Sequence, residues 1–120
     1  MNNFDQRRSR YLQDSLPIRL GGLAANLSRI ASFSKHAGTR EVVSSILIES
    51  RWFIEWTAAE LEMHQAAELV ELQVQLALWD LQSPQKWHDE NWRHGIAAKV
   101  GQWSQRILEM SGLLSPYRDA

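Results

Sequence analysis

The sequence contains no cysteine, and only three prolines and six glycines among its 120 residues. Without cysteine, the chain cannot form a disulfide framework, a thiol nucleophile or a thiolate metal site. The first twenty residues include Arg7, Arg8 and Arg10 and lack the apolar stretch of a secretory signal. No apolar run is long enough to span a membrane. We therefore expect a cytoplasmic protein with no membrane segment.

Motifs typical of enzymes, metal sites and nucleotide sites are also missing. The Glu-x-x-His motif of carboxylate-bridged di-metal bundles does not occur, and Gly21-Gly22 fits neither phosphate-binding glycine pattern. His88, Asp89 and His94 lie close in sequence, but a polar connector of this kind is usually solvated. The remaining histidine spacings are those of helix-surface pairs: Glu60–His64, His64–Glu68 and Glu90–His94. We expect no catalytic residue, no cofactor and no metal.

Apolar residues recur at helical spacing along most of the chain, and no segment alternates as a half-buried strand does. This periodicity predicts helices at about 17–35, 40–56, 57–81 and 92–111. Residues 61–64 are less periodic, so a loop or a separate turn is the alternative there. The third of these has a predicted buried seam of Leu69, Leu72, Leu76 and Trp79. We interpret four more residues as widening that seam: Val70, Val74, Ala77 and Leu81.

Local signals predict where these helices begin and end. Ser15 with Pro17 favours a helix start, and Gly112 favours a left-handed residue at a helix end. The segment 57–60, Thr-Ala-Ala-Glu, has the form of a capping box and predicts a break followed by a new helix. Pro84 after Ser83 predicts the end of that helix and a polar connector at 85–91.

Four helices joined by short turns predict an all-α fold, an antiparallel up-and-down four-helix bundle with an N-terminal arm or short extra helix. We expect the arm at residues 1–14, the bundle at 15–114 and a C-terminal tail at 115–120. The first and last bundle helices should be neighbours. The predicted core consists of Leu20, Leu23, Leu27, Ile30, Val42, Ile46, Phe53, Leu69, Leu72, Leu76, Ile96, Val100, Trp103 and Ile107.

Charge is segregated along the chain although the net charge is only −1. Residues 1–40 contain seven Lys and Arg against two Asp and Glu, residues 41–90 contain two against ten, and residues 91–120 contain four against two. We interpret this pattern as complementarity between neighbouring helices of one molecule. No basic surface interleaved with aromatic residues follows the N-terminal arginines, so we do not expect nucleic-acid binding.

Six tryptophans are the unusual feature of the composition. On the helix at 40–56, Ile48, Trp52 and Trp56 share a face about 80° wide, opposite the main apolar face, at the 100° per residue of an α-helix. Two tryptophans and an isoleucine present on the order of 500 Å² of apolar surface, which something should cover. The cover is the N-terminal segment, through Phe4, Tyr11 and Leu12, or a wider bundle packing in which this helix is central, or a partner such as a second copy.

Two resemblances to known proteins can be drawn. The segments SFSKH at 32–36, IESRWFIEWT at 48–57, ELVELQVQL at 68–76 and ILEMSGLL at 107–114 resemble small uncharacterised all-helical proteins of cyanobacteria, which imply no transferable activity or catalytic residue. Arg29 and His36 loosely resemble the Arg and His pair of HEPN ribonucleases. The polar residue that this family has after its arginine is here Ile30, which fits a buried seam better.

The apolar face therefore gives the main functional hypothesis. We expect a non-enzymatic helical interaction or assembly protein that binds a protein partner or a second copy as a homodimer, with Ile48, Trp52 and Trp56 as the candidate interface. The alternative is a small-molecule-binding bundle with a tryptophan-lined cleft between helices. A third hypothesis, RNA binding or HEPN-like cleavage through the basic helices, has the least support in the sequence.

Overall fold

The computed structural model describes residues 2–114, and this part of the chain is all-helical, with no strand. Its elements are α1 (Asn3–Leu12), α2 (Leu16–Phe33), the 3-10 turn η1 (Ala37–Thr39), α3 (Arg40–Thr57), the 3-10 turn η2 (Ala58–Glu60), α4 (Met63–Lys86) and α5 (Glu90–Ser111). The predicted all-α class is confirmed, and the N-terminal arm is a helix. The predicted tail at 115–120 lies outside the described residues.

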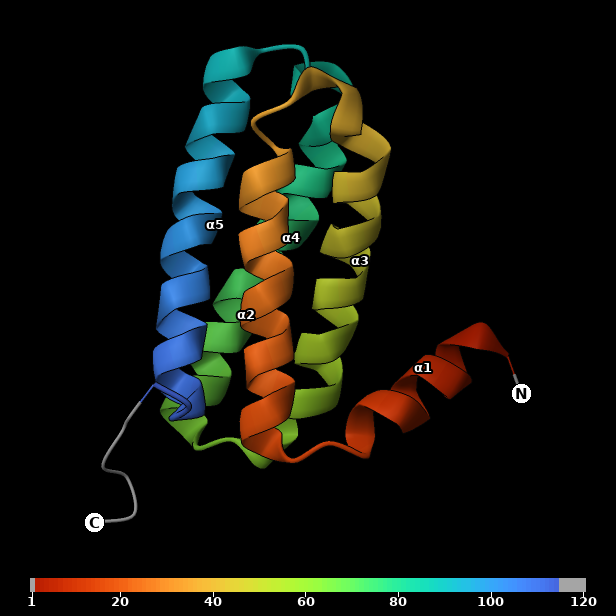
Figure 1. The fold of residues 1–120 in the computed structure, drawn as a ribbon, viewed down its shortest axis with the longest axis vertical. Coiled ribbons are helices and arrows are strands. Elements are labelled where there is room, and N and C mark those ends of the chain that lie inside the picture. Colours follow the sequence, from red (N-terminus) through yellow and green to blue (C-terminus); the bar gives the residue numbers. More distant parts are fainter. Residues whose placement is uncertain (1, 115–120) are drawn as a thin grey trace.

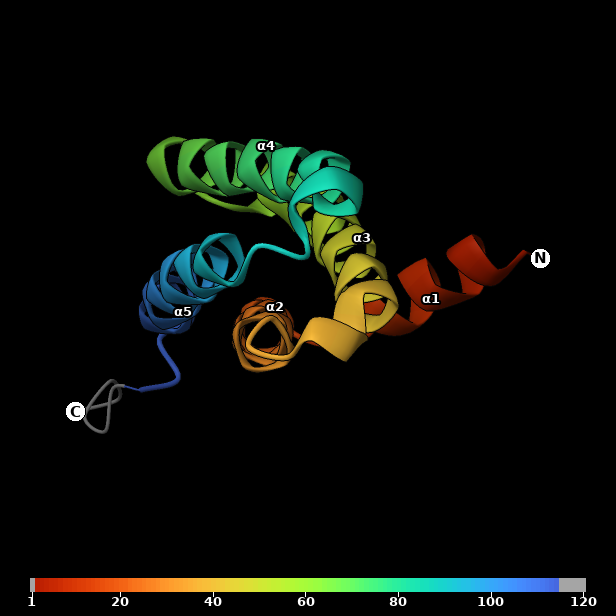
Figure 2. The same ribbon diagram turned by 90° about the horizontal axis from the view of Figure 1, so that it is seen from above.

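The four longer helices lie side by side, and α1 diverges from them at the end where α2 begins (Figure 1). α2 makes its most extensive contact with α5 and also packs against α3, while α3 packs against α4. The first and last of the predicted bundle helices are therefore neighbours, as expected. α4 and α5 make little contact. Seen from above, α4 lies at a slant while α2 is viewed nearly down its axis (Figure 2), which leaves α4 and α5 apart.

One apolar core runs between the helices. Its buried members include Leu20, Leu23, Leu27, Ile30, Val43, Ile46, Leu47, Ile54, Leu69, Leu72, Leu76, Trp79, Ile96, Val100 and Ile107. Three predicted core residues differ. Val42 is 45% exposed, because the inner face of α3 is centred on Val43 and Ile54, whereas Phe53 and Trp103 are only partly buried against the core.

The helix end predicted at about residue 81, before Ser83-Pro84, is wrong, because α4 continues through Pro84 to Lys86. A proline in a helix lacks one N–H donor and costs about 3 kcal/mol. Here Trp87 offsets the loss: its backbone N–H donates to the Ser83 carbonyl at 2.9 Å, and its buried indole N–H donates to the Ala37 carbonyl at 2.6 Å. Tertiary anchoring of this tryptophan keeps the last turn helical.

The predicted capping box at 57–60 is also wrong. Thr57 is the last residue of α3 and is completely buried, with its hydroxyl 3.2 Å from that of Tyr11. Glu60 does not reach back to a helix start, because it accepts two hydrogen bonds from Arg19, at 2.6 and 2.9 Å. α4 begins at Met63 with no side-chain cap. By contrast, Gly112 has φ 77°, the left-handed conformation that the sequence predicted for the end of α5.

The expected charge complementarity within one molecule is confirmed. Each arginine–carboxylate ion pair in residues 2–114 joins a basic terminal segment to the acidic middle segment: Arg7–Glu49, Arg19–Glu60 and Arg106–Glu68. The pairs bridge α1 to α3, α2 to η2 and α5 to α4. Oppositely charged segments of the sequence therefore meet on neighbouring elements of the fold.

Candidate functional site

The aromatic face of α3 is covered by α1. The Phe4 ring meets Trp52 edge-on, with centroids 5.0 Å apart, and Trp56 at 5.3 Å. The Tyr11 ring stacks on Phe53 at 4.0 Å and lies 5.7 Å from Trp56. The N-terminal segment therefore supplies the cover, which was one of the alternatives predicted from the sequence.

Tyr11 fixes the far end of this cover. Its hydroxyl donates to the Arg19 carbonyl at 3.0 Å and lies 3.2 Å from the Thr57 hydroxyl. Burial raises the pKa of the Tyr11 hydroxyl to about 12. The Arg19 guanidinium lies 6.0 Å from the Tyr11 ring centre and also donates to the Asp14 carbonyl. This network ties α1 to the start of α2 and the end of α3.

The cover leaves only part of the predicted interface accessible. Trp56 is 9% exposed, so no partner reaches it while α1 is docked. Ile48 is 37% exposed, and Trp52 is partly buried. A shallow groove of about 290 Å³ brings these two residues together with Phe4, Arg51, Glu55 and Gln73. The three predicted interface residues are thus divided into one buried and two at the surface.

A second apolar surface, missed at the sequence level, runs along the outer face of α4. We call it the α4 stripe; its exposed members are Met63 (88% exposed), Val70 (48%), Val74 (54%), Leu78 (48%) and Leu81 (76%). The stripe lies opposite the buried seam of Leu69, Leu72, Leu76 and Trp79, each at most 8% exposed. The interpretation that Val70, Val74 and Leu81 widen that seam is therefore wrong.

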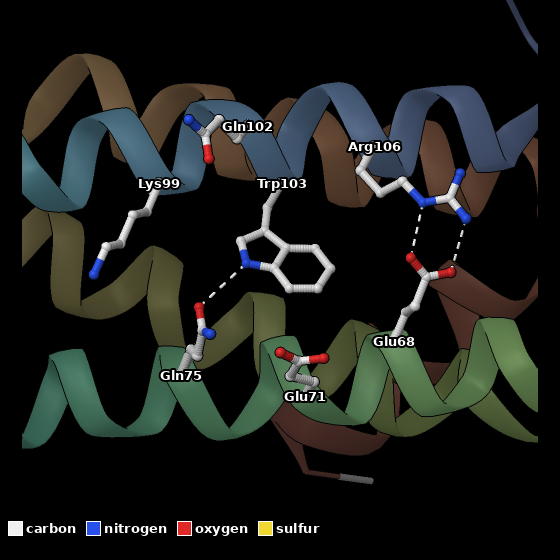
Figure 3. A pocket seen from close by; sticks show the side chains of 7 residues that line it. All are labelled: Glu68, Glu71, Gln75, Lys99, Gln102, Trp103 and Arg106. Atoms are coloured by element: carbon white, nitrogen blue, oxygen red, sulfur yellow. Dashed lines mark hydrogen bonds and ion pairs between the residues drawn. The ribbon is translucent and has the colours of Figure 1, made fainter.

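The gap between α4 and α5 forms an open, polar cleft of about 430 Å³ (Figure 3). At one end Arg106 donates to both carboxylate oxygens of Glu68, each at 2.8 Å, and this holds the pKa of Glu68 below its usual value. In the middle the Trp103 indole N–H donates to the Gln75 side-chain oxygen at 3.2 Å. Lys99, Gln102 and Glu71 complete the lining. Of the six tryptophans, which the alternative hypothesis places around a cleft between helices, only Trp103 lines this one.

The histidines considered as metal or catalytic residues are dispersed over the surface. His64 lies 3.5 Å from Glu62, and His94 lies 3.7 Å from Glu90. Within residues 2–114, no three His, Asp or Glu side chains converge on one point. Ile30 is completely buried, which agrees with its place in a core seam rather than beside a HEPN-type arginine.

Searches for similar proteins add no further assignment. No protein-family model, no curated protein sequence and no solved structure matches the chain. Between residues 2 and 114, no helix is both long enough and apolar enough to cross a lipid bilayer. The surfaces of the folded chain are therefore its best indication of function.

Proposed function

We propose that this protein is a non-enzymatic helical interaction protein that acts by binding another polypeptide. The α4 stripe is the observation that carries the proposal. Five aliphatic side chains, each about half exposed or more, follow one another along a single helix face. An apolar patch of this extent on a folded protein typically marks a binding surface. The Ile48 and Trp52 groove is a second contact area on the neighbouring α3.

The scaffold for this function is, in our proposal, an antiparallel up-and-down bundle of α2 to α5. Short connections between successive helices and the contacts of α2 with both α3 and α5 support it. In such an arrangement α4 is held through its inner seam containing Leu72 and through side-chain bonds to α5 such as Arg106–Glu68. The outer face is then presented on a rigid support, which favours a defined interface.

A photo-crosslinking amino acid at Val74, introduced into the protein in its source cells, tests this function. We expect one adduct of defined mass, whose yield falls when Val70→Lys is added. Val42 is the matched control site, since it is also a valine, 45% exposed, on a different helix. Equal labelling from Val42 and Val74, or labelling that Val70→Lys leaves unchanged, would contradict the proposal.

A second candidate function, binding of a small polar molecule in the α4–α5 cleft, is favoured by Trp103. Its indole forms one wall of the cleft, and its N–H bonds to a side chain that a ligand could replace (Figure 3). Against this function, Glu68 and Arg106 already satisfy each other. Titration with a set of small polar compounds, followed through the Trp103 indole resonance, decides the question. If no compound shifts it, this function is excluded.

A further inference from the structure

The α4 stripe has a regular spacing that indicates which kind of partner fits it. With Ala67 and Ala77, the centre line of the stripe contains residues 63, 67, 70, 74, 77 and 81, which are separated by steps of four, three, four, three and four. Leu78, the remaining exposed member, lies about 60° to one side of this line at 100° per residue. This is the 3.5-residue repeat of a coiled-coil seam. The stripe is therefore suited to pack against one other helix along its whole length.

The order of side-chain sizes along this line of six residues, which excludes Leu78, is the same in both directions. It is Met, Ala, Val, Val, Ala, Leu, a large residue at each end, alanine next to each end and valine in the centre. If two such helices pack antiparallel around a two-fold axis near position 72, Met63 meets Leu81, Ala67 meets Ala77 and Val70 meets Val74. The small pairs let the backbones approach, while the large pairs close the two ends.

We propose that the partner of the α4 stripe is a second copy of this chain, bound through two antiparallel α4 helices. This inference rests on the proposed function and names its partner. A two-fold axis makes one patch serve both subunits, so a self-complementary patch is what such a dimer requires. The stripe meets that requirement without any rearrangement of the core seam on the opposite face of α4.

The antiparallel orientation follows from two features. A coiled-coil seam has two alternating positions, and parallel two-stranded coils favour a β-branched residue at the first and leucine at the second. In the α4 stripe, valine occupies both, because Val70 and Val74 stand at different positions of the repeat. Antiparallel packing also places the N-terminus of each helix dipole beside the C-terminus of its partner. Both features disfavour a parallel pair.

The size of the surface is sufficient for a specific contact. Residues 63–81 span roughly 27 Å at 1.5 Å per residue. The exposed members of the stripe leave on the order of 600 Å² of apolar surface in water, at the upper end for one patch on a monomer. Two copies therefore bury on the order of 1,200 Å² before flanking polar residues are included, which reaches the lower bound of standard interfaces.

A charged residue beside the stripe distinguishes a second copy from a different partner. Glu71 is exposed and follows Val70, so the two copies of Glu71 face each other near the axis. Like charges at this distance weaken the contact modestly. Glu71→Gln should then tighten the dimer by about two- to five-fold, and added salt should act in the same direction. A heterologous partner has no reason to respond in this way.

Sedimentation of the purified full chain tests the proposal. The wild type should have twice the 13.9 kDa chain mass. The double variant Val70→Lys and Val74→Lys should weaken association by about 100-fold or more, with helicity and cooperative melting retained. Val42→Lys, a matched change of an exposed valine on α3, should remain a dimer.

Disulfide trapping gives the orientation and does not depend on the lysine variant folding. Because the chain lacks cysteine, introduced thiols report only on the interface. A mixture of Met63→Cys and Leu81→Cys chains should form the mixed disulfide, and Met63→Cys alone should not. Self-linking of Met63→Cys would overturn the antiparallel pairing.

A wild type that stays monomeric at its solubility limit would overturn self-association. If Val74 still crosslinks a different polypeptide in cells, the proposed function is retained and only the second copy is rejected.

Discussion

The outer faces of α3 and α4 each have an apolar stripe opposite the core, yet only one of them is covered. On α3, α1 places Phe4 against Trp52 and Trp56. On α4, Val70, Val74 and the other stripe residues contact solvent. The difference shows that a second apolar stripe on a bundle helix has no fixed role. The aromatic stripe of α3 is covered by another helix of the same chain, whereas we propose that the aliphatic stripe of α4 is covered by another molecule.

The largest expected effect separates the inner and outer faces of α4. Leu72 is completely buried, and Leu72→Ala should lower the free energy of unfolding by roughly 2–5 kcal/mol. Val74 is 54% exposed, so Val74→Ala should change it by less than about 0.5 kcal/mol at concentrations where the chain is monomeric. Denaturant unfolding of both variants measures the contrast. A similar loss at the two positions would mean that the stripe is part of the core.

The next largest effect is expected at Tyr11, which anchors α1 over the stripe of α3. Tyr11→Phe removes a hydroxyl that meets the Arg19 carbonyl and the buried Thr57 hydroxyl, so it should cost about 1–3 kcal/mol near neutral pH. The stabilisation should also depend on pH, because burial raises the pKa of Tyr11 from 10.0 to about 12. A raised tyrosine pKa means that the folded chain prefers the neutral hydroxyl.

The stabilisation from neutral Tyr11 is thus complete below pH 10 and is lost as the pH rises towards 12, by roughly 2–3 kcal/mol. Unfolding free energies of the wild type and Tyr11→Phe, compared across this interval, isolate the contribution from other alkaline titrations. Parallel pH profiles for the two proteins would show that Tyr11 is not buried as a neutral group.

Much of the inner structure could be predicted from the sequence, because each core seam repeats at helical spacing. Leu20, Leu23 and Leu27 on α2 have only one apolar face to bury, so periodicity alone assigns them. α4 has apolar residues on both sides, and periodicity does not indicate which side has a partner. The stripe could have been separated from the seam by its own steps of four and three residues, which are offset from those of Leu69 and Leu72.

The sequence signals that failed are local ones overruled by distant contacts. Pro84 predicts a helix end, but the hydrogen bond from Trp87 to Ala37 joins residues fifty positions apart. The hydroxyl of Thr57 is near that of Tyr11, and Glu60 pairs with Arg19. These partners lie on other elements, so no window of neighbouring residues reveals them. For the same reason, the sequence left several alternatives open for what covers Trp56.

A smaller effect is expected at the edge of the cover. Phe4 is 38% exposed and makes edge contacts with two tryptophans, so Phe4→Ala should weaken docking of α1 by about 1 kcal/mol. A ten-residue helix is marginal alone in water, so loss of docking should also unfold α1. Amide hydrogen exchange in α1 is the direct measurement. Faster exchange in α1, with α2 to α5 unchanged, is the expected outcome, while uniform acceleration would place Phe4 in the cooperative core.

The smallest effect, at Arg7, tests whether aromatic contact or charge holds the cover. The Arg7 guanidinium lies 3.4 Å from a Glu49 oxygen and 5.9 Å from the Trp52 ring centre, and both ionic side chains are partly exposed. Exposed pairs of this kind contribute little because water and salt screen them, so Arg7→Ala should cost less than about 0.5 kcal/mol. Glu49 also retains its bond from the buried Asn26 amide, at 3.0 Å, when Arg7 is removed. Exchange rates in α1 should therefore rise less than in Phe4→Ala. Arg7→Ala could instead release α1 as fully as Phe4→Ala does. That result would mean that charge, rather than aromatic packing, holds α1 on α3. The contrast between the covered stripe of α3 and the open stripe of α4 would then not be one between aromatic and aliphatic side chains.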